Sequence, residues 1–443
     1  MSLTVDKIIN ASWVIPVETD NLTLKNHSVV IHQGKILDIV PTGTAKQNYT
    51  TAENIDLYEH AIIPGLINAH THAAMNLFRG LADDLPLMDW LNNHIWPAEQ
   101  NFVNEEFVAD GTNLAIAEMI KGGTTCFNDM YFNPDITAQI AEKSHIRASL
   151  GLIVIDFPSS WATNQDEYFD KGLHVYDQYK DHPLINLTFA PHAPYSVSDE
   201  PLKRIQTLVN ELEIPIHMHI HETQHEIELG LESHAKRPIE RLNELGLLTP
   251  SLIAVHMTQL TKDDISLIAN AGCHVVHCPQ SNLKLASGFC PISKLIDAGI
   301  NVALGTDSAA SNNNLNMFEE MKTAALLAKA ITSDASSIPA YQALKMATLN
   351  GAKALGIDDI TGSLTKGKSA DITAIKLDNI STMPIYNPIS QIVYASQANS
   401  VSNVWIEGKQ VLKDHQLTLM NETEILHKAQ AWGEKISANP SIL

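Results

Sequence analysis

Short apolar segments alternate with helix-forming segments through the middle of this 443-residue chain. The apolar segments are rich in valine, isoleucine and leucine, without strict polar alternation, as is typical of strands covered on both faces. Eight of them occur, at residues 62–69, 124–130, 147–154, 185–191, 214–220, 252–258, 273–279 and 301–307. Eight β-α units predict an α/β fold, a (β/α)8 TIM-like barrel whose functional residues lie at the carboxyl ends of the strands.

The structural alternative is an open, doubly wound sheet. That fold commonly carries a G-x-G-x-x-G turn after its first strand, and no such motif follows the first strand here. The helical segments are also clearly delimited. For example, Asn104 can cap a helix over 105–121, and Gly122-Gly123 can end it. The pattern therefore favours the barrel.

The two ends of the chain have the pattern of β-hairpins. At each end, strand-like segments flank a glycine turn, within residues 26–40 and 404–412. Neither end is long enough to bury a core by itself. We therefore expect residues 1–62 and 363–443 to form one composite β-sandwich, and residues 63–362 to form the barrel.

Composition limits the classes of partner and the cellular location. With 29 basic against 50 acidic residues the net charge is −21, which disfavours binding to nucleic acid or to an anionic membrane. The sequence contains no 18-residue apolar stretch and no basic segment followed by an apolar one at its start. The four cysteines lack C-x-x-C spacing and are expected to be free thiols, which predicts a cytoplasmic protein.

Histidines and one aspartate occupy the predicted carboxyl ends of five of the eight strands. They are His70 and His72, His192, His217, His219 and His221, His256, and Asp307. Barrel interiors are normally filled by branched apolar side chains, and buried imidazoles are costly unless something satisfies them. One such histidine would more often be a satisfied core residue, but their coincidence at one rim indicates a metal site.

Imidazole nitrogen and carboxylate oxygen are ligands of zinc, with iron(II) as the alternative. His70 and His72 alternate on one strand and therefore project from the same face. Asp307 and one histidine of the fifth strand complete the expected set. Strand parity does not choose among the three histidines of that strand, because all three share it.

These motifs resemble the amidohydrolase superfamily and, within it, the 5′-methylthioadenosine/S-adenosylhomocysteine deaminase family. The resemblance extends over nearly the whole chain. The segments that carry it most specifically are residues 76–80 and 83–87, Trp90 with Glu99, residues 190–196, residues 306–312, and the return to the terminal domain at 362–372.

The resemblance implies which residues bind the metal. The fifth-strand pattern His-x-x-Glu of the family selects His219 as a ligand and Glu222 as the proton shuttle. The implied ligands are His70, His72, His219 and Asp307. Relatives with two ions bridge them by a lysine on the fourth strand, and residues 185–191 contain none, so one divalent ion per subunit is expected.

The implied reaction is hydrolytic deamination of an adenine nucleoside at C6, giving the inosine analogue and ammonia. The metal supplies hydroxide at neutral pH, and Glu222 protonates the purine at N1. His256 and Asp307 would orient the hydroxide and take its proton. The implied substrate contacts are stacking by Trp90, ribose binding by Glu99, and a purine contact from His192.

One departure concerns the 5′ substituent of the substrate. Relatives that use S-adenosylhomocysteine are expected to hold its carboxylate with an arginine after the third strand, and residues 153–161 contain no arginine. Arg147 lies at the opposite end of that strand. The sequence thus favours 5′-methylthioadenosine or adenosine over S-adenosylhomocysteine.

Other functions on the same scaffold remain as alternatives. They are guanine deamination, triazine dechlorination and a non-catalytic binding role. Several dechlorinating relatives lack the glutamate of the fifth strand, so Glu222 favours a deaminase, and the complete ligand set opposes a non-catalytic scaffold. The family also leads us to expect a homo-oligomer, a dimer or a tetramer.

Overall fold

The computed structural model describes residues 2–439. The chain divides into two compact units. The first comprises Met1–Asn68, Ala117–Cys126 and Asn316–Met420, and the second comprises Ala69–Ile116, Phe127–Leu315 and Asn421–Leu443.

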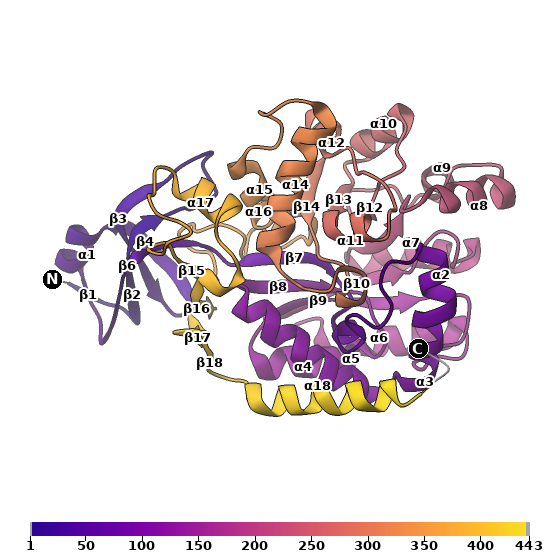
Figure 1. Cartoon of the computed structure of the whole chain (residues 1–443), viewed down its shortest axis with the longest axis horizontal. Coiled ribbons are helices and arrows are strands. Elements are labelled where there is room, and N and C mark those ends of the chain that lie inside the picture. Colours follow the sequence, from indigo (N-terminus) through magenta and orange to yellow (C-terminus); the bar gives the residue numbers. More distant parts are fainter. Residues whose placement is uncertain (1, 440–443) are drawn as a thin grey trace. The chain divides into compact units, whose positions relative to one another are not determined.

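Eight strands follow one another in chain order around a nearly closed barrel (Figure 1). They are β7 (Leu66–Thr71), β8 (Thr124–Asp129), β9 (Arg147–Val154), β10 (Ile185–Pro191), β11 (Ile216–Ile220), β12 (Leu252–His256), β13 (His274–His277) and β14 (Asn301–Leu304). The pairs from β9 to β14 are parallel. The prediction of a (β/α)8 barrel is confirmed, and each predicted strand coincides with an observed one.

The first predicted strand needs one adjustment. Residues 62–69 belong to two strands, because β6 (Glu53–Pro64) ends just before Gly65 and β7 begins just after it. A side chain at Gly65 would place its Cβ 2.0 Å from Oγ1 of Thr125 in β8, so only glycine fits at this point between β6 and β7 in the chain. The chain thus passes from the terminal sheet into the barrel at this glycine.

Strands from both ends of the chain form one mixed eight-stranded sheet, as the hairpin patterns predicted. Its order is β18 (Gln416–Leu417), β17 (Lys409–Lys413), β16 (Val401–Ile406), β15 (Ile372–Lys376), β6, β2 (Lys7–Val14), β3 (Leu24–His32) and β4 (Lys35–Pro41). The two ends meet where β15 pairs antiparallel with β6. Figure 1 shows the indigo and yellow strands side by side in this sheet. β1 (Leu3–Thr4) and β5 (Tyr49–Thr50) form a separate pair.

Helices lie between the barrel strands and also follow the last of them. Those before β14 are α4 (Glu105–Lys121), α5 (Pro134–Ser144), α6 (Gln165–Tyr179), α7 (Asp199–Leu212), α8 (Gln224–His234), α9 (Pro238–Glu244), α10 (Lys262–Ala271), α11 (Pro279–Lys284) and α12 (Ile292–Asp297). Those after it are α13 (Ala309–Asn312), α14 (Met317–Thr332), α15 (Ala340–Met346), α16 (Leu349–Ala354), α17 (Pro388–Tyr394) and α18 (Glu422–Ser437), while α1 (Thr42–Asn48) precedes the barrel. The predicted helix over 105–121 is confirmed as α4.

A long connecting segment with short helices follows β7 at the rim of the barrel. It contains η1 (Ala73–Phe78), α2 (Leu87–Trp90), η2 (Leu91–Ile95) and α3 (Trp96–Phe102). Its apolar side chains pack in a core that also includes Phe107 and Trp432. Trp432 of α18 donates a hydrogen bond to Asp110 of α4, so the C-terminal helix lies beside α4 (Figure 1). Loops at the carboxyl ends of barrel strands commonly carry functional residues.

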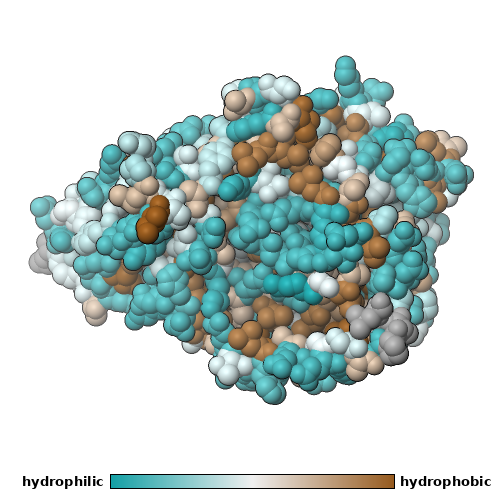
Figure 2. All heavy atoms as spheres, in the orientation of Figure 1, coloured by the Kyte–Doolittle hydropathy of each residue, from teal (hydrophilic) through white to brown (hydrophobic). Residues whose placement is uncertain are grey.

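No helix within residues 2–439 is long and apolar enough to cross a membrane. Figure 2 shows hydrophilic side chains over much of the viewed face, with smaller hydrophobic areas between them. Scattered exposed apolar residues are normal on a folded protein.

Candidate metal and active site

Three imidazoles and one carboxylate converge at the carboxyl end of the barrel, all within the second unit or at its border. Nε2 of His70 lies 3.2 Å from Nε2 of His219 and 3.3 Å from Oδ1 of Asp307. Nε2 of His72 lies 3.2 Å from the same carboxylate oxygen. Two overlapping groups here have ligand atoms close enough to hold one ion: His70, His72 and His219, and His70, His256 and Asp307.

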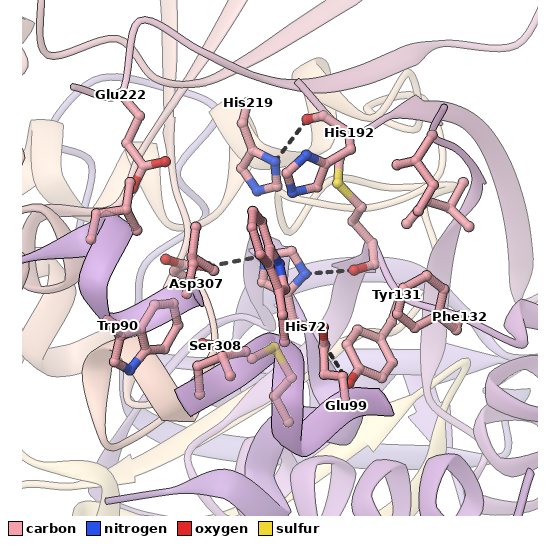
Figure 3. A pocket seen from close by; sticks show the side chains of 18 of the residues that line it. His72, Trp90, Glu99, Tyr131, Phe132, His192, His219, Glu222, Asp307 and Ser308 are labelled. Carbon is pink, nitrogen blue, oxygen red and sulfur yellow. Dashed lines mark hydrogen bonds and ion pairs between the residues drawn. The ribbon is translucent and has the colours of Figure 1, made fainter. Parts of the chain in front are cut away.

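The outer nitrogens of these histidines are held by hydrogen bonds. Nδ1 of His72 donates to the carbonyl of Met130 at 2.5 Å, and Nδ1 of His219 donates to the carbonyl of His192 at 2.8 Å (Figure 3). Because a carbonyl can only accept, both rings turn an Nε2 lone pair toward the centre. Such partners fix the tautomer and the ring orientation of histidine ligands.

The structure separates the three histidines that strand parity left equivalent. His219 reaches the centre, whereas Nε2 of His217 lies 2.9 Å from Nδ1 of His70, behind that ring. His221 turns away from the centre, where its Nε2 accepts from the backbone of Ile239 and its Nδ1 donates to Gln259. The side chain selected by the family pattern is thus the one at the centre.

Hydroxyl groups fix the far oxygen of Asp307. Its Oδ2 accepts from Ser281 at 2.6 Å and from Ser311 at 2.8 Å. The backbone just before Asp307 passes close to His70, because a Cβ on Gly305 would lie 2.8 Å from Cβ of His70. Asp307 itself has φ of 64°, a conformation that L-residues seldom adopt outside functional sites.

The electrostatics of the centre favour a positive charge. Burial opposes ionisation, yet the two histidines hold the pKa of the Asp307 carboxyl well below its usual value. Burial is the largest single influence on His72 and opposes its protonation, but the hydrogen bond and the charge of Asp307, the Met130 carbonyl and the charge of Asp129 together outweigh it and raise the pKa of His72 to about 9. By contrast, burial lowers the pKa of His70 to about 3. A buried carboxylate beside several imidazoles is the donor set expected for a divalent cation.

Glu222 and His256 lie on one side of this centre. Nε2 of His256 is 3.9 Å from Oε2 of Glu222, and Nδ1 of His256 is 2.8 Å from the side-chain oxygen of Asn282. Burial raises the pKa of Glu222, the charge of Asp307 adds to that effect, and His256 opposes it. A raised pKa brings a carboxyl group closer to the range in which it can donate and accept protons near neutral pH.

A cavity of about 810 Å³, counted to its open mouth, extends outward from these residues. His72, His219, Glu222 and Asp307 line its floor, and Trp90, Glu99 and His192 line its walls (Figure 3). His256, next to Glu222, lines it as well. Its lining is mostly apolar and aromatic with a few convergent polar groups, as is usual for small-molecule sites. The structure therefore brings every predicted substrate residue to one cavity.

Each wall residue has a defined partner. Glu99 accepts a hydrogen bond from the hydroxyl of Tyr131 at 2.8 Å, while burial raises the pKa of Glu99 to about 7. Nδ1 of His192 lies 2.9 Å from the hydroxyl of Ser196, and burial lowers the pKa of His192 to about 4. Trp90 is 5% exposed and packs in the core under the loop as well as lining the cavity.

The mouth of the cavity is aromatic. The rings of Trp96 and Phe157 lie 6.3 Å apart between their centroids, next to Ile153 and Ile155. The residues that line this cavity and the adjoining outer hollow, as far as the structure describes them, include neither lysine nor arginine. Arg147 lies at the start of β9 and donates to the carbonyl of Pro183, as its place in the sequence predicted.

Sequence reasoning missed several residues that complete the site. Tyr131 follows β8, and Ser281 and Asn282 belong to α11 after β13. Their position just beyond strand ends was the one available signal. A tyrosine, a serine and an asparagine are too common in loops for that signal to select them. Glu226 was also missed, although it follows Glu222 closely, in the first turn of α8.

Comparison with known proteins agrees with this geometry. Residues 61–411 match the model of the amidohydrolase family. The chain is 49% identical over 435 residues to the 5-methylthioadenosine/S-adenosylhomocysteine deaminase of Teredinibacter turnerae, with 98% of each chain covered. It is 46% identical to a solved adenosine deaminase from Xanthomonas campestris with bound zinc, with a TM-score of 0.98 and coverage of 99% and 100%.

More distant structures share the fold alone. The guanine deaminase of E. coli is 20% identical with a TM-score of 0.84, covering 92% of this chain and 99% of its own. From the family match and the near-complete alignment with curated relatives, the chain belongs to the amidohydrolase family.

Proposed function

We propose that this protein is a metal-dependent deaminase that hydrolyses the amino group at C6 of an adenine nucleoside. The observation that carries the proposal is the convergence of His70, His72, His219 and Asp307 beside Glu222 and His256 at the floor of one cavity. Relatives named 5-methylthioadenosine/S-adenosylhomocysteine deaminase, and a zinc-containing relative named adenosine deaminase, support the same reaction.

The donor set fits one divalent ion. Tetrahedral zinc with ligands at about 2.0–2.1 Å has ligand–ligand separations of about 3.3–3.4 Å. Three separations between the ligand atoms match this geometry: His70 to His219, His70 to Asp307 and His72 to Asp307 are 3.2–3.3 Å apart. We propose these four residues as the ligands of one zinc ion per subunit, with iron(II) as the alternative. When bound, such an ion lowers the pKa of a coordinated water from 15.7 to about 7.

Protein groups would then carry the proton transfers. Glu222, with its raised pKa, protonates the purine at N1 while the oxygen of water adds to C6. His256 and Asp307 orient that water and accept its proton. The proton taken from water then passes to N6, the C6–N6 bond breaks and ammonia leaves, while the C6 hydroxyl returns a proton to Glu222 and the inosine analogue remains.

The cavity walls would hold the nucleoside. Glu99 binds the ribose hydroxyls, which a carboxylate can accept as a pair of hydrogen bonds. Trp90 packs on the nucleoside, and His192 contacts the purine edge. The aromatic mouth formed by Trp96 and Phe157 takes the 5′ substituent.

The chemistry of that mouth favours an uncharged substituent. The 5′ group of 5′-methylthioadenosine or adenosine is neutral, whereas S-adenosylhomocysteine carries an amino acid. A carboxylate placed against Phe157 and Ile155 would lose water without gaining a cation. We therefore propose 5′-methylthioadenosine and adenosine as preferred substrates, with S-adenosylhomocysteine as the weaker one.

Three further expectations stay predictions. The division at residues 1–62 with 363–443 against 63–362, the dimeric or tetrameric assembly, and the lack of affinity for nucleic acid each follow from the sequence. Sedimentation of the purified protein measures the assembly directly.

The decisive experiment is ammonia release from metal-loaded protein. The panel contains 5′-methylthioadenosine, S-adenosylhomocysteine, adenosine, guanine and a chlorotriazine, and the control is the variant His72→Ala. We expect fast turnover of the adenine nucleosides and none by the variant. Turnover of guanine alone, or chloride release from the triazine, would replace the proposed reaction by one of the alternatives.

A further inference from the structure

Two buried side chains, neither of which lines the cavity, bind the backbone N–H and the backbone carbonyl of Glu222. We infer that Glu226 and Thr258 are positioning residues, which fix the backbone of Glu222 and so aim its carboxyl group at the substrate. The inference rests on the proposed deaminase function and assigns new residues to it.

Glu226 binds the amide side of this unit. Its Oε1 accepts the backbone N–H of His221 and its Oε2 accepts that of Glu222, both at 2.8 Å. The side chain is 3% exposed. Glu226 lies in the first turn of α8, whose N-cap is Thr223. A glutamate at this position of a helix usually accepts the backbone N–H of the N-cap residue. Here Glu226 instead accepts the N–H groups of the two residues that precede Thr223, His221 and Glu222.

Thr258 binds the carbonyl side. Its hydroxyl donates to the carbonyl of Glu222 at 2.7 Å, and the side-chain amide of Gln259 donates to that hydroxyl at 2.9 Å. The backbone N–H of Thr258 also donates to the carbonyl of His221 at 3.0 Å. Glu222 is thus fixed from α8 on one side and from the segment after β12 on the other.

The backbone at this point needs such support. β11 ends at Ile220, and His221 has φ of 54°, in the left-handed region that L-residues seldom adopt. This turn directs the side chain of Glu222 into the cavity, where its Oε2 lies 3.9 Å from His256. Strained backbone of this kind persists only where surrounding contacts determine it.

The choice of a carboxylate is itself informative. Burial raises the pKa of Glu226 to about 8, whereas the backbone N–H groups of His221 and Glu222 favour its ionised form. A neutral side chain would fill the same space without that desolvation cost. Only a carboxylate offers two acceptor oxygens to two adjacent N–H groups, so the costly group is the one that fits the clamp.

The test compares single variants under saturating metal. Glu226→Gln keeps the volume but turns an N–H₂ donor toward one of the two backbone donors, and Thr258→Val keeps the shape but removes the hydroxyl. We expect each to lower kcat for 5′-methylthioadenosine at least tenfold, with KM and metal content within twofold of wild type, because rates depend on sub-ångström placement of reacting groups. Thr258→Ser restores the hydroxyl and is expected to restore kcat.

The matched control is Glu228→Gln, an exposed glutamate of the same helix, for which kcat is expected to be unchanged. A kcat within twofold of wild type in both Glu226→Gln and Thr258→Val overturns the inference, as does a loss of kcat that only follows metal loss. If Glu226→Gln fails to fold, the pair Thr258→Val and Thr258→Ser decides.

A crystal structure of Glu226→Gln separates this inference from the proposed function. A displaced Glu222 carboxyl group supports the clamp even if no adenine nucleoside is turned over by the wild type. An unmoved Glu222 overturns the clamp and leaves the deaminase proposal intact.

Discussion

Nδ1 of His70 lies 2.9 Å from Nε2 of His217, so two histidines from neighbouring positions of the barrel interior form a buried pair. His217 is fully buried, and its ring packs edge-on against that of His70. Partners behind a metal-binding histidine orient its ring and tune its basicity.

The variant His217→Phe keeps a ring of similar shape and removes this hydrogen bond. We expect the affinity for zinc to fall by about 10–100-fold, the usual cost of losing such a partner. Competition with a chromophoric chelator measures it. His60→Phe, a buried histidine of β6 in the terminal sheet, is the matched control and should bind zinc like the wild type. Equal affinity in His217→Phe would show that the pair does not orient His70.

Variants of Glu222 and His72 are expected to distinguish a loss of catalysis from a loss of metal binding. Glu222→Gln removes the proton donor and is expected to lower kcat by about 10²–10⁴-fold with full metal content. His72→Ala removes a ligand and is expected to lose both metal and activity. Metal analysis beside ammonia release distinguishes the two. A Glu222→Gln variant with most of its activity would contradict the proton-shuttle role.

The pH dependence of substrate capture reports on Glu99. Burial raises the pKa of Glu99 to about 7, above the ordinary value of 4.5, so its carboxylate is lost as the pH falls through about 7. Because the ionised group is the better acceptor for ribose hydroxyls, we expect kcat/KM to fall on the acid side of pH 7. In Glu99→Gln this limb should disappear while kcat/KM is low at every pH. Persistence of the limb would assign it to another group.

Specificity for the 5′ substituent should respond to charge at the cavity mouth. Phe157 is 43% exposed there, so an arginine at this position can reach solvent and a bound carboxylate. We expect Phe157→Arg to raise kcat/KM for S-adenosylhomocysteine relative to 5′-methylthioadenosine by about fivefold, since a partly exposed ion pair is worth up to about 1 kcal/mol. Phe157→Gln, which removes the ring without adding charge, is the control. The same change of ratio in both variants would rule out charge as the cause.

Much of the architecture could be predicted from local pattern. The eight barrel strands, the helix α4 and the hairpins of both ends are apolar or turn patterns within short windows of sequence. Pairings between distant segments could not be predicted in the same way. For example, Ala374 faces Ile62 across β15 and β6, and no local pattern specifies that register.

The sequence by itself determined which residues could form the site, because periodicity assigns histidines and an aspartate to strand ends that a barrel brings together. Strand parity alone left His217, His219 and His221 equivalent and only the family resemblance selected His219, whereas the tertiary structure shows that they face His70, the centre and Ile239 respectively. Only the tertiary structure revealed the partners of the predicted residues. They are Tyr131 beside Glu99, Ser281 beside Asp307, Asn282 beside His256, and Glu226 at the backbone of Glu222. Their roles depend on distances across the barrel rim, set by packing between elements far apart in the chain.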